Sequence, residues 1–198
     1  MSSSEAFFAL LVYSFVTSVT PGPNNLMLLA SGVNFGIVRT IPHILGIGSG
    51  FMTLLFAVGF GLGAVLMAFP VLHLALKIAG GAYLLYLAYR TAMSRSLKDG
   101  EAKAQPMTFL EAAAFQWVNP KAWVMALTSM AVYTNPERPF LSVLIISLVF
   151  AVLNIPTVAI WAGFGTALRG FLSDPARLKW FNIAMGLLLV ATLWPMLK

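Results

Sequence analysis

One six-residue segment near the N-terminus combines groups that could bind a small charged solute. Its two prolines remove two backbone N–H donors and displace the carbonyls one turn earlier, so a helix cannot run through it unbroken. The carbonyls freed before the first proline suit an ammonium or another cation, and the amides that begin the next helical stretch suit a carboxylate. An amino acid presents both charges. The candidate binding residues here are Thr20, Pro21, Gly22, Pro23, Asn24 and Asn25.

A second segment repeats this chemistry in the other half of the chain. It combines two side-chain amides with a proline and a lysine, namely Gln116, Asn119, Pro120 and Lys121. A further candidate, Asn154, precedes Pro156. Because prolines often only kink membrane helices and Asn often makes interhelical hydrogen bonds, the structural and the binding interpretation of Asn154 both stay open. For residues 20–25 the binding interpretation is favoured, because a kink does not require two prolines, a glycine and two amides together.

Lys121 is the most unusual charged residue of the chain. It lies about 13 residues into a predicted membrane helix, where an ammonium costs about 3 kcal/mol on insertion scales. The side chain could extend to the nearer membrane surface. The adjacent Asn119-Pro120 break favours the other position, in which Lys121 faces a cavity.

The composition places these groups inside a membrane and excludes a soluble or disordered protein. Apolar residues make up 60% of 198, about 119 residues, enough for about six spans of roughly 20 residues. Charged residues make up 9%, against roughly 25% in soluble domains, and the mean hydropathy is +0.89. We expect an all-α membrane protein, because backbone polar groups in lipid must be satisfied within each span.

Charged residues and turn signals divide the chain into six predicted transmembrane helices. They are expected over about 6–30, 40–67, 71–90, 108–133, 140–168 and 178–197. Residues 31–39 are expected to connect the first two, and the polar stretch 91–107 forms the main loop. The first and fourth helices contain the two polar segments and are therefore expected to be broken.

The basic residues predict the orientation, because cytoplasmic loops are enriched in Lys and Arg. The side opposite the termini carries eight of them: Arg39, Arg90, Arg95, Lys98, Lys103, Arg169, Arg177 and Lys179. The other side carries at most three: Lys77, Arg138 and Lys198. The chain is therefore predicted to be a multi-pass protein with both termini outside the cytoplasm.

The two halves of the chain show short matches in the same order. Residues 20–21 correspond to 119–120, 59–61 to 163–165, and 78–81 to 183–186. A repeat of three helices has an odd number of spans, so its second copy enters the membrane with the opposite orientation, as in many transporters. We expect a 3+3 inverted repeat of residues 1–92 and 108–198, joined by a cytoplasmic loop at 93–107.

These motifs carry a family resemblance. Thr-Pro-Gly-Pro-Asn-Asn at 20–25 resembles the signature of the LysE/RhtB family of bacterial amino-acid exporters. The glycine-rich helix after Arg39 and the stretch Phe-Gln-Trp-Val-Asn-Pro-Lys at 115–121 resemble the same family, and the similarity covers essentially the whole chain. The loop from Lys98 to Pro106, followed by Phe109, resembles the cysteine/O-acetylserine exporter branch.

The resemblance implies a secondary transporter of the bacterial inner membrane. Its substrates would be small neutral amino acids or derivatives of the homoserine, threonine, cysteine or O-acetylserine type, exported by antiport with the proton gradient through a pathway lined by both polar segments. A proton antiporter usually has a carboxylate or histidine relay within the membrane, and no Asp or Glu lies deep in this chain. Lys121, Glu111 or the substrate ammonium could carry the coupling charge, and the sequence does not choose among them.

Other functions have less support. An exporter of another small solute or of a metal cation is the first alternative, but a chain with no cysteine and two histidines offers few metal ligands. A membrane enzyme is the second, and its candidate groups, His43, His73 and Glu111, fall in different predicted helices. We expect no enzymatic activity, cofactor, bound metal or nucleic-acid partner. The expected partners are the substrate and the bilayer; a transporter of this length could form a homodimer, but nothing in the sequence selects one.

Overall fold

The computed structural model describes residues 3–94 and 105–194, and within these ranges the chain forms helices and no strands. Of the predicted loop, residues 95–104 lie outside the described part, as does Lys198. The elements are α1 (Ser3–Val19), α2 (Pro23–Phe35), α3 (Ile37–Ala57), η1 (Val58–Leu62), α4 (Gly63–Ala68), α5 (Pro70–Ala92), α6 (Phe109–Gln116), α7 (Pro120–Tyr133), α8 (Pro139–Leu168), η2 (Phe171–Ser173) and α9 (Pro175–Ala191).

The expected break in the first helix is present. α1 ends at Val19 and α2 begins at Pro23, and the two helices are bent by 52°. Neither Pro21 nor Pro23 has an N–H, so the last carbonyls of α1 have no partners in a continuing helix. Pro23 begins α2, where the first N–H would have no intrahelical partner in any residue.

The expected break in the fourth helix is also present. α6 ends at Gln116 and α7 begins at Pro120. The side chain of Asn119 caps α7, because its oxygen accepts a hydrogen bond of 3.1 Å from the backbone N–H of Lys121. In both breaks a proline therefore opens the second half-helix.

The predicted connector at 31–39 is wrong. α2 extends to Phe35 and α3 begins at Ile37, so that Gly36 alone separates them. Gly36 has φ of 79°, a conformation that glycine adopts without strain. The polar residues that suggested a loop face the interior instead, and the hydroxyls of Ser31 and Thr40 form a buried hydrogen bond of 2.8 Å.

The predicted helix over 40–67 is present as the helical stretch Ile37–Leu66, but its helical geometry is not uniform. The helix is interrupted at η1, where Gly61 has φ of 108°. The matching triplet at 163–165 lies inside the continuous helix α8, so these two glycine-rich triplets differ in conformation. The last helix begins at Pro175, three residues earlier than the predicted 178, and α9 ends at Ala191.

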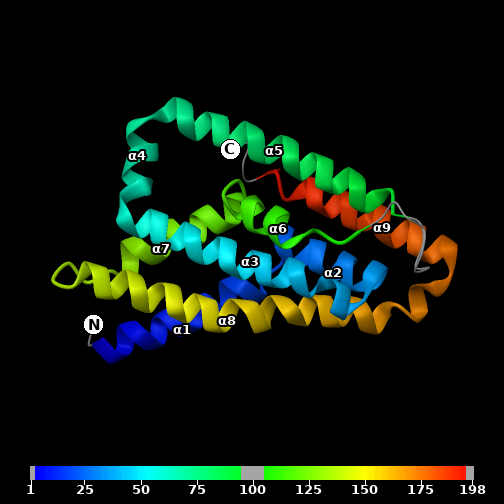
Figure 1. The fold of residues 1–198 in the computed structure, drawn as a ribbon, viewed down its shortest axis with the longest axis horizontal. Coiled ribbons are helices and arrows are strands. Elements are labelled where there is room, and N and C mark those ends of the chain that lie inside the picture. The colour runs from blue at the N-terminus through cyan, green and yellow to red at the C-terminus, as the bar shows by residue number, and fades with distance from the viewer. Residues whose placement is uncertain (1–2, 95–104, 195–198) are drawn as a thin grey trace.

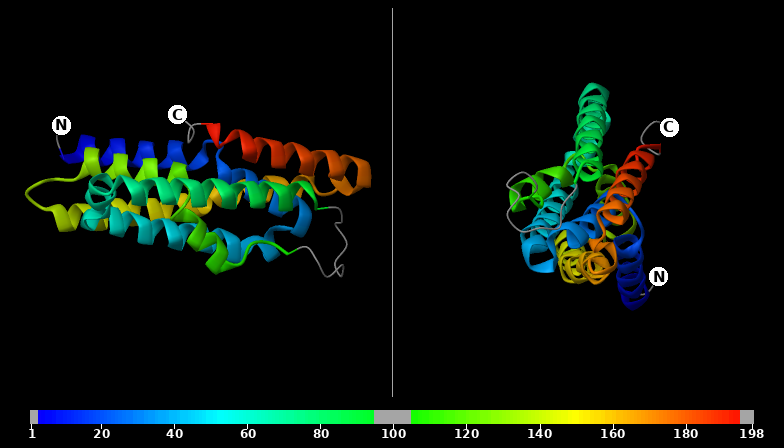
Figure 2. Two further views of the ribbon diagram at one scale, coloured as in Figure 1. Left: turned by 90° about the horizontal axis from the view of Figure 1, so that it is seen from above. Right: turned by 90° about the vertical axis from the view of Figure 1, so that its right-hand side faces the viewer.

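The long helices run roughly along one axis of the molecule, as Figures 1 and 2 show. α8 packs against α1, α2 and α3, α6 packs on α3, and α9 lies beside α5. The α2–α3 connector, the end of α5 and the α8–α9 turn lie at one end, on the right in Figure 1. The N-terminus, the α7–α8 turn and α4 lie at the other end, and α4 carries the chain across from α3 to α5.

Glycines allow two pairs of helices to pack backbone against backbone. A Cβ on Gly32 or Gly165 would overlap a carbonyl oxygen of the facing helix, Ala162 on α8 or Leu29 on α2 respectively. Gly46 and Gly50 of α3 contact the backbone of α6 in the same way. Because lipid provides no hydrophobic driving force for helix association, such interfaces are stabilised by the close van der Waals contacts that small residues permit.

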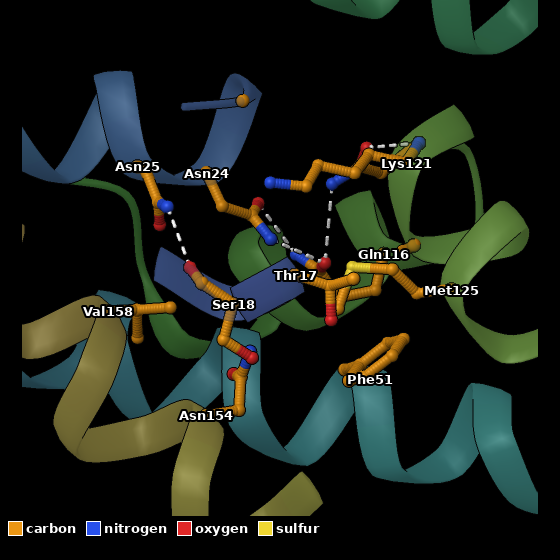
Figure 3. A pocket seen from close by; sticks show the side chains of 13 residues that line it. Thr17, Ser18, Asn24, Asn25, Phe51, Gln116, Lys121, Met125, Asn154 and Val158 are labelled. Atoms are coloured by element: carbon orange, nitrogen blue, oxygen red, sulfur yellow. Dashed lines mark hydrogen bonds between the residues drawn. The ribbon is translucent and has the colours of Figure 1, made fainter. Parts of the chain in front are cut away.

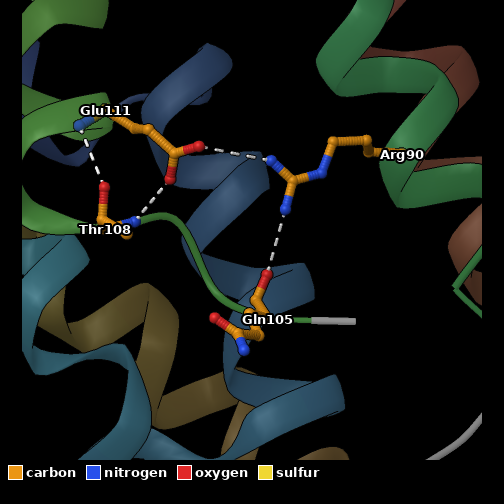
Figure 4. Close-up of polar contacts among 4 residues, drawn as sticks. All are labelled: Arg90, Gln105, Thr108 and Glu111. Atoms are coloured by element: carbon orange, nitrogen blue, oxygen red, sulfur yellow. Dashed lines mark hydrogen bonds and ion pairs between the residues drawn. The ribbon is translucent and has the colours of Figure 1, made fainter. Parts of the chain in front are cut away.

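The start of α6 is held by a capping box (Figure 4). Thr108 Oγ1 accepts from the backbone N–H of Glu111 at 3.2 Å, and Glu111 Oε2 accepts from the backbone N–H of Thr108 at 2.7 Å. The other carboxylate oxygen of Glu111 lies 3.7 Å from Nη1 of Arg90 on α5. Glu111 therefore has Arg90 as its described cation partner, which the sequence analysis did not identify.

Two helical stretches in the described ranges, Ile37–Leu66 and Pro139–Leu168, are long and apolar enough to cross a membrane by length and composition. The bent pair α1 and α2 passes the same test when its two parts are taken together. Each half alone is too short, and the two halves together form a third candidate span.

Candidate functional site

A polar pocket lies where both helix breaks meet α3 and α8 (Figure 3). Its cavity volume is about 20 Å³, and a single water needs about 10–15 Å³. An amino acid therefore does not fit until side chains move. The lining residues are Thr17, Ser18, Gly22, Asn24, Asn25, Phe51, Gln116, Asn119, Lys121, Ala122, Met125, Asn154 and Val158.

Seven of the eleven residues proposed from the sequence line this pocket. They are Gly22, Asn24, Asn25, Gln116, Asn119, Lys121 and Asn154. Pro23 and Pro120 instead form the first turns of α2 and α7, and Thr20 and Pro21 contact the pocket through Lys121. The structure thus brings together residues from three segments that lie far apart in the chain.

Six lining residues were missed by the sequence analysis. Thr17 and Ser18 belong to the polar approach to the first break, so the sequence contained a signal for them. The others are apolar and do not differ in type from packing or lipid-facing residues. They are Phe51, Ala122, Met125 and Val158.

Asn24 and Gln116 join the two breaks through a reciprocal amide pair. Asn24 Nδ2 donates to Gln116 Oε1 at 2.8 Å, and Gln116 Nε2 donates to Asn24 Oδ1 at 3.1 Å. Gln116 is fully buried and also donates to the carbonyl of Ala112 at 3.0 Å. Gln116 Oε1 also accepts from Asn119 Nδ2 at 3.5 Å, so Gln116 has no free hydrogen-bonding group, whereas Asn24 keeps one N–H and one oxygen lone pair for another partner.

Other side chains cap the freed carbonyls at the end of α1. Asn25 Nδ2 donates to the carbonyls of Ser18 and Thr20, both at 2.8 Å. Trp161 Nε1 donates to the carbonyl of Val19 at 3.2 Å. Asn25 therefore holds the break in shape, in addition to lining the pocket.

Lys121 extends from α7 across the pocket toward the first break, as Figure 3 shows. Its Nζ donates to the carbonyl oxygen of Thr20 at 2.7 Å and to the Thr20 hydroxyl at 3.0 Å. The carbonyl oxygen of Pro21 is 3.5 Å away. Of the two positions considered from the sequence, the one that faces the cavity is found.

Asn154 presents an unsatisfied acceptor in the pocket wall. Its Nδ2 donates to Ser18 Oγ at 3.1 Å, while its Oδ1 is buried without a hydrogen-bond partner. Because an unpaired buried acceptor costs about 1–3 kcal/mol, this oxygen would be stabilised by a donor such as an ammonium or a water. The pocket thus combines a cation, side-chain amides and free or exchangeable acceptors.

Two of the three residues named for the enzyme alternative, Glu111 and His43, lie away from the pocket. Glu111 holds the start of α6, and His43 is buried in α3, 1% exposed, with neither ring nitrogen hydrogen-bonded. Neither residue lines the pocket.

Comparison with known proteins identifies relatives over nearly the whole chain. A family model described as LysE type translocator matches residues 15–192. A cysteine/O-acetylserine efflux protein of Escherichia coli (strain K12) is 29% identical over 184 residues, 92% of each chain. A Shigella flexneri protein with the same name gives the same identity and coverage. No solved structure gives a significant match.

Proposed function

Because the chain belongs to the family of LysE type translocators, we propose that it exports small neutral amino acids or their derivatives from the cytoplasm. The pocket between the two helix breaks carries this proposal. It offers oxygen acceptors for an ammonium beside a lysine and amide N–H groups for a carboxylate, and both charges belong to every amino acid. Among the candidate substrates, cysteine and O-acetylserine are favoured, since the relatives at 29% identity are efflux proteins named for them.

The pocket lining supports substrates with small uncharged side chains. In the described lining residues the one charged group is Lys121, and no carboxylate is present for a basic side chain. Phe51, Met125 and Val158 provide the apolar part of the wall. Of the eleven residues proposed from the sequence, seven line the pathway and Pro23 and Pro120 shape the breaks. Thr20 and Pro21 belong to the first break and also offer oxygen acceptors to an ammonium.

The architecture proposed for transport is six spans in a 3+3 inverted repeat, residues 1–92 and 108–198. Helix packing supports it, because exchanging the halves preserves several of the contacting pairs, although α2–α9 has no α7–α5 counterpart of similar extent in the described residues. α1 and α2 pack on α8 as α6 and α7 pack on α3, while α5 pairs with α9 and α3 with α8. The pocket then lies at the interface of the repeats, the position expected for a substrate site.

We further propose that the transporter lies in the bacterial inner membrane with both termini outside and works as a proton-coupled antiporter. Five of the eight basic residues of the proposed cytoplasmic side are described, and their elements all meet at one end of the molecule: Arg39, Arg90, Arg169, Arg177 and Lys179. Glu111 is committed to the capping box and to Arg90, away from the pocket. Lys121 and the substrate ammonium are thus the better candidates for the coupling charge.

Counterflow in proteoliposomes tests the proposed function. Liposomes loaded with one unlabelled amino acid should take up the same labelled amino acid when they contain the wild-type protein, with cysteine and O-acetylserine first in the panel. In Asn24→Ala the rate should fall at least about tenfold, because both bonds of the amide pair are lost and Gln116 is left with unpaired groups.

Asn135→Ala is the matched control, because Asn135 is an exposed asparagine in the α7–α8 turn. This variant should exchange like the wild type. Absence of exchange of any amino acid by folded wild-type protein would refute the proposed function, and full exchange by Asn24→Ala would refute the site.

A further inference from the structure

The end of α1 is an acceptor site for an ammonium. A helix C-terminus carries a partial negative charge of about half an electron, and here the two prolines leave its carbonyls exposed to donors from other segments. Ser18, Val19 and Thr20 accept from neutral side chains, Asn25 and Trp161. Lys121 donates to the Thr20 carbonyl as well, and it also has the Thr20 hydroxyl and the Pro21 carbonyl as acceptors.

Lys121 occupies this site without a neighbouring anion. Every hydrogen-bond acceptor of its Nζ in the described structure is an uncharged oxygen, and no described carboxylate lies within ion-pair distance. A lysine side chain ends in the same group as the α-ammonium of an amino acid, a tetrahedral –NH₃⁺ with three donors. The set that binds Lys121 is therefore chemically competent to bind a substrate ammonium.

The lysine also occupies the space that a substrate needs. Its side chain runs over Gly22, where a Cβ would lie 2.7 Å from Lys121 Cδ and 3.1 Å from Nζ. The backbone of Gly22 is extended, with φ of −174° and ψ of 176°, so the backbone itself accepts any residue there. Because Gly22 has no side chain, Lys121 can lie across it. The cavity that remains beside Lys121 is about 20 Å³.

Resting on the proposed function, we propose that Lys121 is a built-in occupant of the substrate-ammonium site and is displaced when an amino acid binds. The substrate ammonium takes the oxygens of Thr20 and Pro21, and the released Lys121 pairs with the substrate carboxylate. Before the exchange the Lys121 ammonium is hydrogen-bonded to uncharged oxygens, and after it the substrate ammonium takes those oxygens while Lys121 gains a carboxylate partner. An amine without a carboxylate can displace Lys121 but gives the released lysine no anionic partner. Such an amine therefore binds poorly as long as Lys121 is present.

The unsatisfied oxygen of Asn154 is a second observation that points to a ligand donor in this pocket. Asn154 is 5% exposed, lines the cavity and donates a hydrogen bond to Ser18. Ser18 lies at the end of α1, two residues before Thr20. A second N–H of a bound ammonium or a water carried with it can satisfy Oδ1. The acceptors for a cation therefore exceed those that Lys121 uses.

Ligand-dependent thermal stabilisation of purified protein tests the proposal, because a ligand that binds the folded state raises Tm with its concentration. The probes are cysteine, its decarboxylated amine cysteamine, and 3-mercaptopropanoate, which lacks the amine. With the wild type, cysteine should stabilise at concentrations at least about tenfold lower than cysteamine. In Lys121→Met the order should reverse, cysteamine gaining and cysteine losing at least about tenfold, because the ammonium site is vacant and the carboxylate has lost its partner.

Gly22→Ala provides a second variant that keeps the charge. The new Cβ pushes the flexible lysine away from Thr20, so cysteamine should bind at least about fivefold more tightly. In a Gly22→Ala, Lys121→Met double variant this gain should vanish, because the group that the Cβ displaces is gone. Lys77→Met, which removes a lysine of α5 that does not line the pocket, is the control and should leave both ligands unchanged.

The outcomes separate this proposal from the proposed function. If wild-type protein exchanges cysteine and an unchanged cysteine-to-cysteamine ratio is found in Lys121→Met, the role of Lys121 is refuted while the exporter stands. If Gly22→Ala acts equally with and without Lys121, displacement of the lysine is likewise refuted. If the wild type neither binds nor exchanges any amino acid, both proposals fall.

Discussion

Buried amide side chains connect the two halves of the molecule at the residue scale. The pair Asn24–Gln116 lies in the pocket, and a second pair, Asn34–Asn182, joins α2 to α9 one helix length away. Asn34 Nδ2 donates to Asn182 Oδ1 at 2.8 Å, and Asn182 Nδ2 donates back at 3.0 Å. Ser94, at the end of α5, donates to Asn34 Oδ1 and accepts from Asn182 through its carbonyl.

Truncation of the two members of this second pair should have unequal costs. Asn34→Ala leaves two groups without their partners, Asn182 Oδ1 and the Ser94 hydroxyl. Asn182→Ala leaves one, the Ser94 carbonyl, while Asn34 stays bonded to the Ala30 carbonyl and to the Ser94 hydroxyl. Each unpaired buried group costs about 1–3 kcal/mol. Asn34→Ala should therefore lower the Tm of the detergent-solubilised protein more than Asn182→Ala does.

The control for this ranking is Asn135→Ala, since Asn135 is exposed in a turn and its loss should cost about 0.5 kcal/mol or less. Equal Tm values for Asn34→Ala and Asn182→Ala would mean that the hydrogen bonds described at Ser94 and Ala30 do not govern the stability of this end of the bundle.

At the scale of the helices, the contact between α2 and α8 depends on the absence of two side chains. Gly32 and Gly165 each face the backbone of the other helix, and the Thr166 hydroxyl also donates to the Gly32 carbonyl at 3.4 Å. α2 carries the first break, and α8 carries Asn154 and Val158 of the pocket wall. The close approach of α2 and α8 therefore sets the width of the pocket.

Gly165→Ala should destabilise the protein, because its Cβ would overlap the backbone of Leu29, which cannot rotate away as a side chain can. Overpacking of this kind typically costs about 1–3 kcal/mol. Gly163→Ala is the matched control two residues away on α8, with nothing within 4 Å of the added Cβ. It should be neutral or stabilising by about 0.5–1 kcal/mol, since alanine favours the helix more than glycine does.

Thermal unfolding of the two variants side by side measures the difference. A Tm for Gly165→Ala at or above that of Gly163→Ala would contradict the backbone contact between α2 and α8.

At the scale of the whole molecule, the connectors gather at two ends of the bundle with different charge. The end formed by the α2–α3 connector and the α8–α9 turn carries four basic residues, Arg39, Arg169, Arg177 and Lys179, and one acidic residue, Asp174, while the α7–α8 turn carries one Glu and one Arg. Such asymmetry orients membrane proteins with the basic end in the cytoplasm. The pocket lies between these ends, as transport across the membrane requires.

Single cysteines test this orientation, because the chain has no cysteine of its own. Glu137→Cys places a thiol in the α7–α8 turn and Ser173→Cys places one at the α8–α9 turn, both at exposed positions. In intact bacteria a membrane-impermeant maleimide should label Glu137→Cys, whereas Ser173→Cys should be labelled only after permeabilisation. The reverse pattern would invert the proposed topology, and labelling of both in intact cells would contradict opposite sides.

Features that depend only on the local residues, such as the helix breaks at prolines, could be predicted from the sequence. A proline lacks its N–H in any fold, so the breaks at 20–22 and 117–119 were predictable, as were the helical class and seven residues of the pocket. Polar type alone was ambiguous, and it misplaced the connector at 31–39: Ser31 and Asn34 face buried partners there instead of water.

Which distant groups contact each other could not be inferred from the sequence and is seen in the folded structure. Lys121 reaches the Thr20 carbonyl 101 positions away, Asn182 meets Asn34 across 148, and Arg90 on α5 lies beside Glu111 on α6. The carbonyls at the end of α1 need hydrogen-bond donors in any arrangement of the helices, but which side chains donate depends on how the helices pack. That packing follows from glycines such as Gly32 and Gly165, whose fit exists only once two helix backbones lie against each other.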